Sequence, residues 1–125
     1  MEAGITITLE GGRGEYAAGD ALKGTVAWDS PGSSEDSAEL SVLWYTEGKG
    51  DQNTGVVHFE EFALDDRRKH PFSAELPLLP LTYHGHLLKI HWLVRVRTGS
   101  GRNRNVRFQL PFVMRAPAGT ASEST

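Results

Sequence analysis

The chain has 125 residues, of which 38% are hydrophobic, and a formal net charge of −3. This length suits one domain that buries roughly two thirds of its unfolded surface without staples. The absence of cysteine excludes a disulfide framework, a thiolate zinc site and a cysteine nucleophile. No apolar stretch approaches the roughly 20 residues of a membrane span, and the first residues lack the pattern of a secretory signal. We therefore expect a soluble, cytoplasmic protein without membrane insertion.

The predicted elements are all β-strands. Alternation of apolar and polar residues, together with turns marked by glycine or proline, predicts seven strands. They lie at 5–9, 15–28, 38–46, 56–64, 70–76, 87–98 and 105–115. The second of these contains a turn at Gly19-Asp20, and its Gly24 indicates that another group packs close to the backbone. Pro71, Pro77 and Pro80 exclude a helix across the segment that begins at His70.

The last two predicted strands form a hairpin with one apolar face on each strand. On the first strand the residues expected to face the core are Leu88, Ile90, Trp92, Val94 and Val96. On the second they are Val106, Phe108, Leu110, Phe112 and Met114. The tryptophans at 28, 44 and 92 all fall on inward positions, which favours a role as core anchors over ligand stacking. Such half-buried strands are typical of an antiparallel sheet.

The fold class follows from these strands. About seven to eight strands with turn residues between them, and no helical period, predict an all-β, antiparallel β-sandwich with immunoglobulin-like architecture. The predicted domain covers residues 1–115, and residues 116–125 have the composition of a disordered tail.

Several motifs resemble those of one superfamily. They are the tyrosine and turn at 16–20, the Gly24-Thr25-Val26 strand, Phe72, Leu76-Pro77, the Pro80-to-Gly85 run and Ile90-His91-Trp92. This set, which spans about residues 5 to 114, resembles the amino-terminal domain of the arrestin-like superfamily, shared with retromer-type arrestin-fold subunits and bacterial sporulation-control proteins. The resemblance implies an arrestin-like sandwich in a single-domain version, and a non-catalytic module that recruits or scaffolds a protein.

The sequence departs from the family in three respects. The second sandwich of typical arrestins has no counterpart in this chain. The strand from Ile5 to Leu9 carries none of the basic residues by which some arrestins sense phosphates. The proline-proline-x-tyrosine motif that recruits ligases is absent as well. We therefore infer no phosphate sensor and no ligase adaptor from the resemblance.

Charge is segregated along the chain. Residues 1–75 carry six Lys or Arg against fifteen Asp or Glu, whereas residues 76–115 carry seven Lys or Arg and no acid. The outward face of the final hairpin, with its turn, is the predicted partner-binding surface, and its candidate residues are Lys89, Arg95, Arg97, Arg102, Arg104 and Arg107. One arginine guanidinium can donate two parallel hydrogen bonds to a carboxylate or phosphate group, so the surface suits an acidic or phosphorylated protein segment. The alternative is that acidic neighbouring strands neutralise it.

Other functions stay open. A peptide or a second copy could pair with a free sheet edge, which makes a homodimer or a purely structural, self-associating sandwich the main alternative. Nucleic acid is the weaker option, because no aromatic series accompanies the arginines. His84 and His86 could share one face, but His91 has the opposite parity to His86, so we predict no metal site. No catalytic motif is present, and we expect neither enzymatic activity nor a cofactor.

Overall fold

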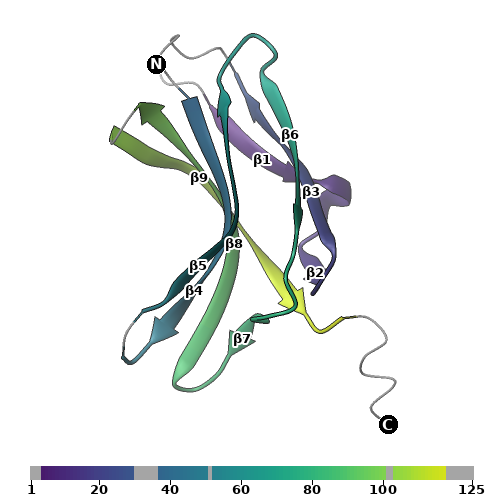
Figure 1. Ribbon diagram of the computed structural model, residues 1–125, viewed down its shortest axis with the longest axis vertical. Coiled ribbons are helices and arrows are strands. Elements are labelled where there is room, and N and C mark those ends of the chain that lie inside the picture. The colour runs from purple at the N-terminus through teal and green to yellow at the C-terminus, as the bar shows by residue number, and fades with distance from the viewer. Residues whose placement is uncertain (1–3, 30–36, 51, 101–102, 118–125) are drawn as a thin grey trace.

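The molecule is a sandwich of two β-sheets (Figure 1). The computed structural model describes residues 4–29, 37–50, 52–100 and 103–117. The small sheet has the order β1 (Ile5–Leu9), β3 (Ala21–Trp28) and β6 (Lys69–Glu75). The large sheet has the order β2 (Glu15–Ala17), β9 (Asn103–Arg115), β8 (Leu88–Ser100), β4 (Ser37–Gly48) and β5 (Thr54–Ala63), and β7 (Tyr83–His84) pairs with β8. A short 3-10 turn, η1 (Glu10–Gly12), follows β1. The predicted fold class is confirmed.

The core lies between the two sheets. Its central residues on the large sheet include Leu40, Val42, Trp92, Val94 and Val96, none more than 1% exposed. The predicted alternation of β8 is therefore confirmed from Trp92 onward. Leu88, in contrast, is 40% exposed, because it starts the strand opposite Gly48, a residue without a side chain.

The three tryptophans face inward as expected. Trp28 and Trp92 are buried, whereas Trp44 is partly buried and packs against the core. The indole Nε1 atoms of the two buried tryptophans donate hydrogen bonds to carbonyl oxygens, Trp28 to Asp65 at 2.9 Å and Trp92 to Pro80 at 2.8 Å. These bonds satisfy the polar end of each ring and so allow the rings to act as core anchors.

The predicted strand at 15–28 is two strands in the structure. Gly19 has φ 88° and therefore turns the chain where other residues would be strained, and the Asp20 carboxylate accepts a hydrogen bond from the Ala17 amide at 3.1 Å. This turn moves the chain from one sheet to the other. β2 runs parallel to β9, whereas β3 lies antiparallel between β1 and β6. The sandwich is therefore not wholly antiparallel.

A β-bulge changes the face of the residues at the start of β9. Val96 pairs with Phe108 and Arg97 pairs with Val106, so Arg107 is an extra residue in β9. Before the bulge the alternation is reversed. The expectation that Val106 faces the core is wrong, because it lies opposite the outward Arg97 and is 45% exposed.

Some predictions concern residues that the structure does not describe. The predicted tail at 116–125 lies outside the described residues from 118 onward, and so does Arg102 in the turn before β9. The domain prediction of 1–115 therefore stays a prediction. Within the part of the chain that is described, no helix is long and apolar enough to cross a membrane.

Candidate partner-binding surface

The candidate site is the outer face of the large sheet, the side that points away from the small sheet. Pairing between β4 and β8 places five rows of side chains on it, namely Glu39 with Arg97, Ser41 with Arg95, Leu43 with Leu93, Tyr45 with His91 and Glu47 with Lys89. The sequence prediction that Lys89, Arg95 and Arg97 share one face is therefore correct. We refer to this surface below as the outer face.

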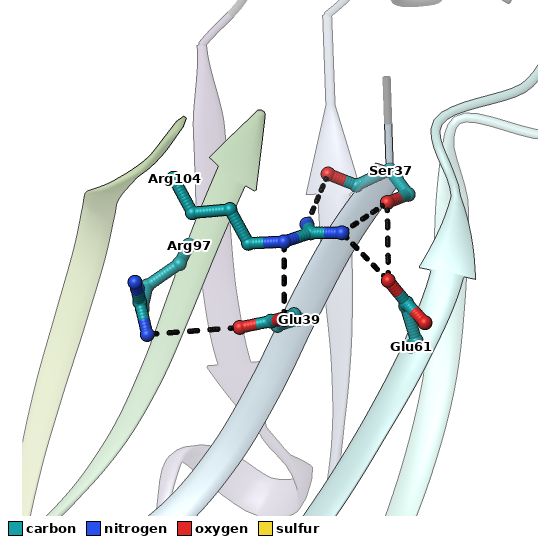
Figure 2. A network of polar contacts seen from close by, with 5 residues as sticks. All are labelled: Ser37, Glu39, Glu61, Arg97 and Arg104. Carbon is teal, nitrogen blue, oxygen red and sulfur yellow. Dashed lines mark hydrogen bonds and ion pairs between the residues drawn. The ribbon is translucent and has the colours of Figure 1, made fainter. Parts of the chain in front are cut away.

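Arg104 belongs to a network of polar contacts at one end of the outer face (Figure 2). Its Nε lies 3.0 Å from Glu39 Oε2, and its Nη2 donates to Glu61 Oε2 at 2.6 Å. Its Nη1 donates to the Ser37 carbonyl at 3.1 Å and its Nη2 to the Ser37 hydroxyl at 2.8 Å. The Arg104 side chain is only 8% exposed. This guanidinium is thus occupied by its own sheet.

Three further predicted cations also have partners inside the domain. Arg97 Nη1 lies 3.7 Å from Glu39 Oε1. Lys89 lies opposite Glu47 and helps His91 to lower the pKa of that carboxyl group. Arg107, the bulge residue, donates to the Thr98 hydroxyl at 3.3 Å, and Thr98 belongs to the inward series of β8. For Arg104, Arg97 and Lys89, neighbouring acidic residues therefore provide the neutralisation that the sequence left open.

Arg95 is different from these cations. Among the described residues, its guanidinium has no ion pair or hydrogen bond, and its Nε is buried without a partner. Its neighbours in the same row are Ser41 on β4 and Gln109 on β9, neither of which carries a charge. A buried N–H group without a partner costs free energy, of the order of 1–3 kcal/mol. Arg95 is therefore a half-buried cation that the described part of the domain does not pair.

A surface hollow lies beside Arg95, which we call the arginine hollow. Its volume is about 340 Å³, and it is lined by Leu43, Tyr45, Gln52, Thr54, Leu93, Arg95 and Gln109. Leu43 and Leu93 form an apolar floor, because they point outward yet are only 2% and 8% exposed. The hollow thus combines one cation, two amide groups and apolar surface, which is typical of a binding site.

Exposed apolar side chains border this hollow on β5. Phe59 pairs with Ser41 and Val56 with Leu43, so both residues extend the rows of Arg95 and Leu93. Phe59 is 55% exposed and Val56 is 53% exposed. The candidate residues from sequence did not include them. One signal was readable, since Phe59 and Phe62 are three residues apart and cannot both face the core of a regular strand.

A second hollow, of about 300 Å³, lies next to the first. We call it the histidine hollow, because His84 and His91 line it together with Tyr45, Leu93, Pro111 and Val113, among others. The ring of His91 stacks on Tyr45 with 4.9 Å between centroids and lies 5.6 Å from the ring of His84. Its Nε2 is 2.8 Å from Glu47 Oε1. These contacts hold the imidazole of His91 as a wall of the hollow.

The histidines do not form a metal centre in the part of the chain that the structure describes. No three His, Asp or Glu side chains there are arranged to hold a metal ion. His58 and His70 instead flank Glu60, with their Nε2 atoms 3.1 Å and 3.0 Å from its two carboxylate oxygens. Because His70 lies on β6 and Glu60 on β5, this pair of contacts joins the two sheets.

One edge of the large sheet is protected against pairing. β5 forms that edge, and a bulge between its contacts with Val42 and Leu43 leaves Val57 as an extra residue. Glu60 lies on the inward series of β5, opposite Leu40. Bulges and inward charges on an edge strand are known devices against strand addition. The outer face is therefore a better candidate surface than this edge.

The fold is similar to that of solved structures. Spo0M, a sporulation control protein from Bacillus subtilis, aligns with a TM-score of 0.63 and 18% sequence identity over 91% of this chain and 49% of that chain. A β-glucosidase from Listeria innocua aligns over 93% of this chain and 16% of its own, with 18% identity and a TM-score of 0.43. No family model and no curated protein matches the sequence.

The similarity to Spo0M establishes the class of fold. The chain has an arrestin-like fold, as its motifs predicted, and shares it with a sporulation control protein. The chain spans about half the length of Spo0M.

Proposed function

We propose that this protein is a non-catalytic binding module that recruits another protein through its outer face. The observation that carries the proposal is Arg95, a half-buried cation without a partner among the described residues, beside a hollow with an apolar floor. Phe59 and Val56 add exposed apolar area on the neighbouring strand. An apolar centre with a single arginine anchor is the composition found at energetically important positions of protein interfaces.

The arrestin-like fold supports a scaffold or regulatory role, which agrees with the proposed recruitment of another protein. The structurally similar Spo0M is described as a sporulation control protein, a name that denotes a regulatory role. We propose the same general class for this chain, acting in the cytoplasm without a cofactor.

Affinity capture from native lysate tests this proposal. We expect the wild-type protein to retain a specific protein that Arg95→Gln and Phe59→Ser each lose, because one variant removes the charge and the other the apolar contact. Arg67→Gln is the matched control, since Arg67 lies on the loop before β6 and pairs with Asp65 at 3.0 Å, away from the outer face. Retention by Arg95→Gln and Phe59→Ser as strong as by wild type would contradict the proposal.

Self-association is the second candidate function, because the exposed Phe59 and Val56 would also suit a second copy of the chain. Sedimentation over a wide concentration range separates the two. A dimer that Phe59→Ser dissociates, with no captured protein, would favour the self-associating sandwich. A monomer that captures a protein would favour recruitment.

A further inference from the structure

The arginine hollow and the histidine hollow are parts of one binding groove. Both are lined by Tyr45 and Leu93, so they lie side by side on the outer face and share a wall. Their other lining residues differ, with Arg95 and Gln109 in one and His84, Pro111 and Val113 in the other. A ligand that lies across the shared wall therefore contacts the cationic Arg95 in the arginine hollow and the apolar Pro111 and Val113 in the histidine hollow.

The charge of the groove selects a monoanion. Arg97 and Arg104 are already paired with Glu39 and Glu61, which leaves Arg95 as the cation of the groove that lacks an acidic partner among the described residues. One guanidinium matches one carboxylate in a two-bond geometry. A phosphate group carries up to two charges at neutral pH and is usually held by several cations. The groove thus suits an Asp or Glu side chain better than a phosphorylated residue.

Strand geometry sets the spacing of the two contacts. Leu93 is two residues from Arg95 along β8, about 7 Å, and His91 is four residues away, about 13 Å. The side chains of an extended peptide that point the same way are spaced by the same intervals. An acidic and an apolar side chain two or four residues apart can therefore reach Arg95 and the histidine hollow together.

We propose that the groove binds an extended segment of a partner protein that carries one Asp or Glu and one large apolar residue two or four positions away. The carboxylate pairs with the terminal Nη groups of Arg95, which are not among the buried atoms without a partner, and the apolar side chain fills the histidine hollow against Pro111 and Val113. This inference rests on the proposed recruiting function and specifies the segment that is recruited.

Binding of short synthetic peptides to the full chain tests the inference. The probes are blocked, otherwise uncharged peptides in which one Glu has a Leu two or four positions before or after it. Amide and Arg95 Nε–H chemical shifts report the place of binding. We expect at least one spacing to shift the Arg95, Leu93 and Tyr45 signals. Replacing its Glu by Gln should weaken binding about tenfold or more, as expected for a charge-assisted hydrogen bond.

Variants of the protein supply the matched controls. Arg95→Gln should weaken binding of the Glu peptide about tenfold. Replacing the Glu of the peptide by Gln should not weaken its binding to this variant any further, because the two changes remove the same contact. Val113→Asp should weaken binding through the histidine hollow while leaving Arg95 in place. Arg67→Gln should bind as wild type does.

Three results would overturn the inference. They are the absence of shifts for every spacing, shifts confined to residues outside the groove, and clearly tighter binding when phosphoserine replaces Glu. Protein capture that depends on Arg95 and Phe59 would still support the recruiting function in each of these cases. Loss of both the peptide shifts and the capture would remove the proposed function as well.

Discussion

The guanidinium of Arg104 on β9 lies 3.0 Å from the carboxylate of Glu39 on β4, with β8 between the two strands. Gly99 makes this contact feasible. It pairs with Arg104 on one side and with Ser37 on the other, and because it has no side chain, the arginine can extend across β8 (Figure 2). The network therefore connects β9, β8, β4 and β5 at one end of the large sheet.

Loss of the Arg104 side chain should destabilise the fold. We expect Arg104→Met to lower the free energy of unfolding by about 3 kcal/mol, because Glu39 would keep a largely buried charge without its closest partner. Urea unfolding measures this. The double variant Arg104→Met/Glu39→Gln should lose less than the sum of the single variants, and additive losses would show that the two groups do not interact.

Arg95 should behave in the opposite way. We expect Arg95→Leu to leave the free energy of unfolding unchanged or to raise it by up to about 1 kcal/mol, because the change removes a buried N–H group without a partner. The same variant should lose the captured protein. Urea unfolding of Arg95→Leu and Arg104→Met compares the free energies of unfolding of the two variants. A loss of stability in Arg95→Leu similar to that in Arg104→Met would show that Arg95 has a structural role.

Gly24 should tolerate no side chain. A Cβ atom at this position would lie 2.6 Å from the Thr8 carbonyl oxygen and 2.8 Å from Phe72 Cζ. We expect Gly24→Ala to cost about 1–3 kcal/mol, as overpacking of a tight core does. Gly14→Ala is the matched control, since nothing lies within 4 Å of its Cβ position, and its effect should stay within about 0.5 kcal/mol. Equal thermal stability of the two variants would refute the close packing at Gly24.

The contacts of Glu60 should make stability depend on acid pH. Burial acts to raise the pKa of Glu60, but the hydrogen bonds with His70 and His58 outweigh it, so its pKa lies below the ordinary value of 4.5. A lowered carboxyl pKa adds stability that is complete above the unfolded value and is lost as pH falls through the folded one.

Urea unfolding between pH 7 and pH 3 checks this dependence. The stability difference between wild type and Glu60→Gln should be constant at neutral pH and shrink as the pH falls below about 5. His70→Asn should change the profile in the same direction, because it removes one of the two contacts. A difference that does not vary with pH would show that the Glu60 carboxylate is not stabilised by its neighbours.

Sequence patterns predicted most of the fold, because alternation and turn residues act locally. The inward series of β8, the strand at Gly24 and the buried tryptophans all followed from a period of two. The errors have local causes that the pattern does not reveal. An extra residue at Arg107 reversed the face of Val106. The residues Glu15–Ala17, before the turn at Gly19, pair with β9 in the large sheet instead of sharing a sheet with Ala21–Trp28.

The sequence alone determined that the chain forms an arrestin-like sandwich with basic residues on the outer face of its final hairpin. Only the tertiary structure decided which of the described basic residues pair with an acidic neighbour of the same domain. Arg95 and Arg97 are two residues apart and look equivalent in sequence, yet Arg97 lies opposite Glu39 and Arg95 lies opposite Ser41. The physical reason is register, because the residue that faces each arginine comes from a strand more than fifty residues earlier in the chain.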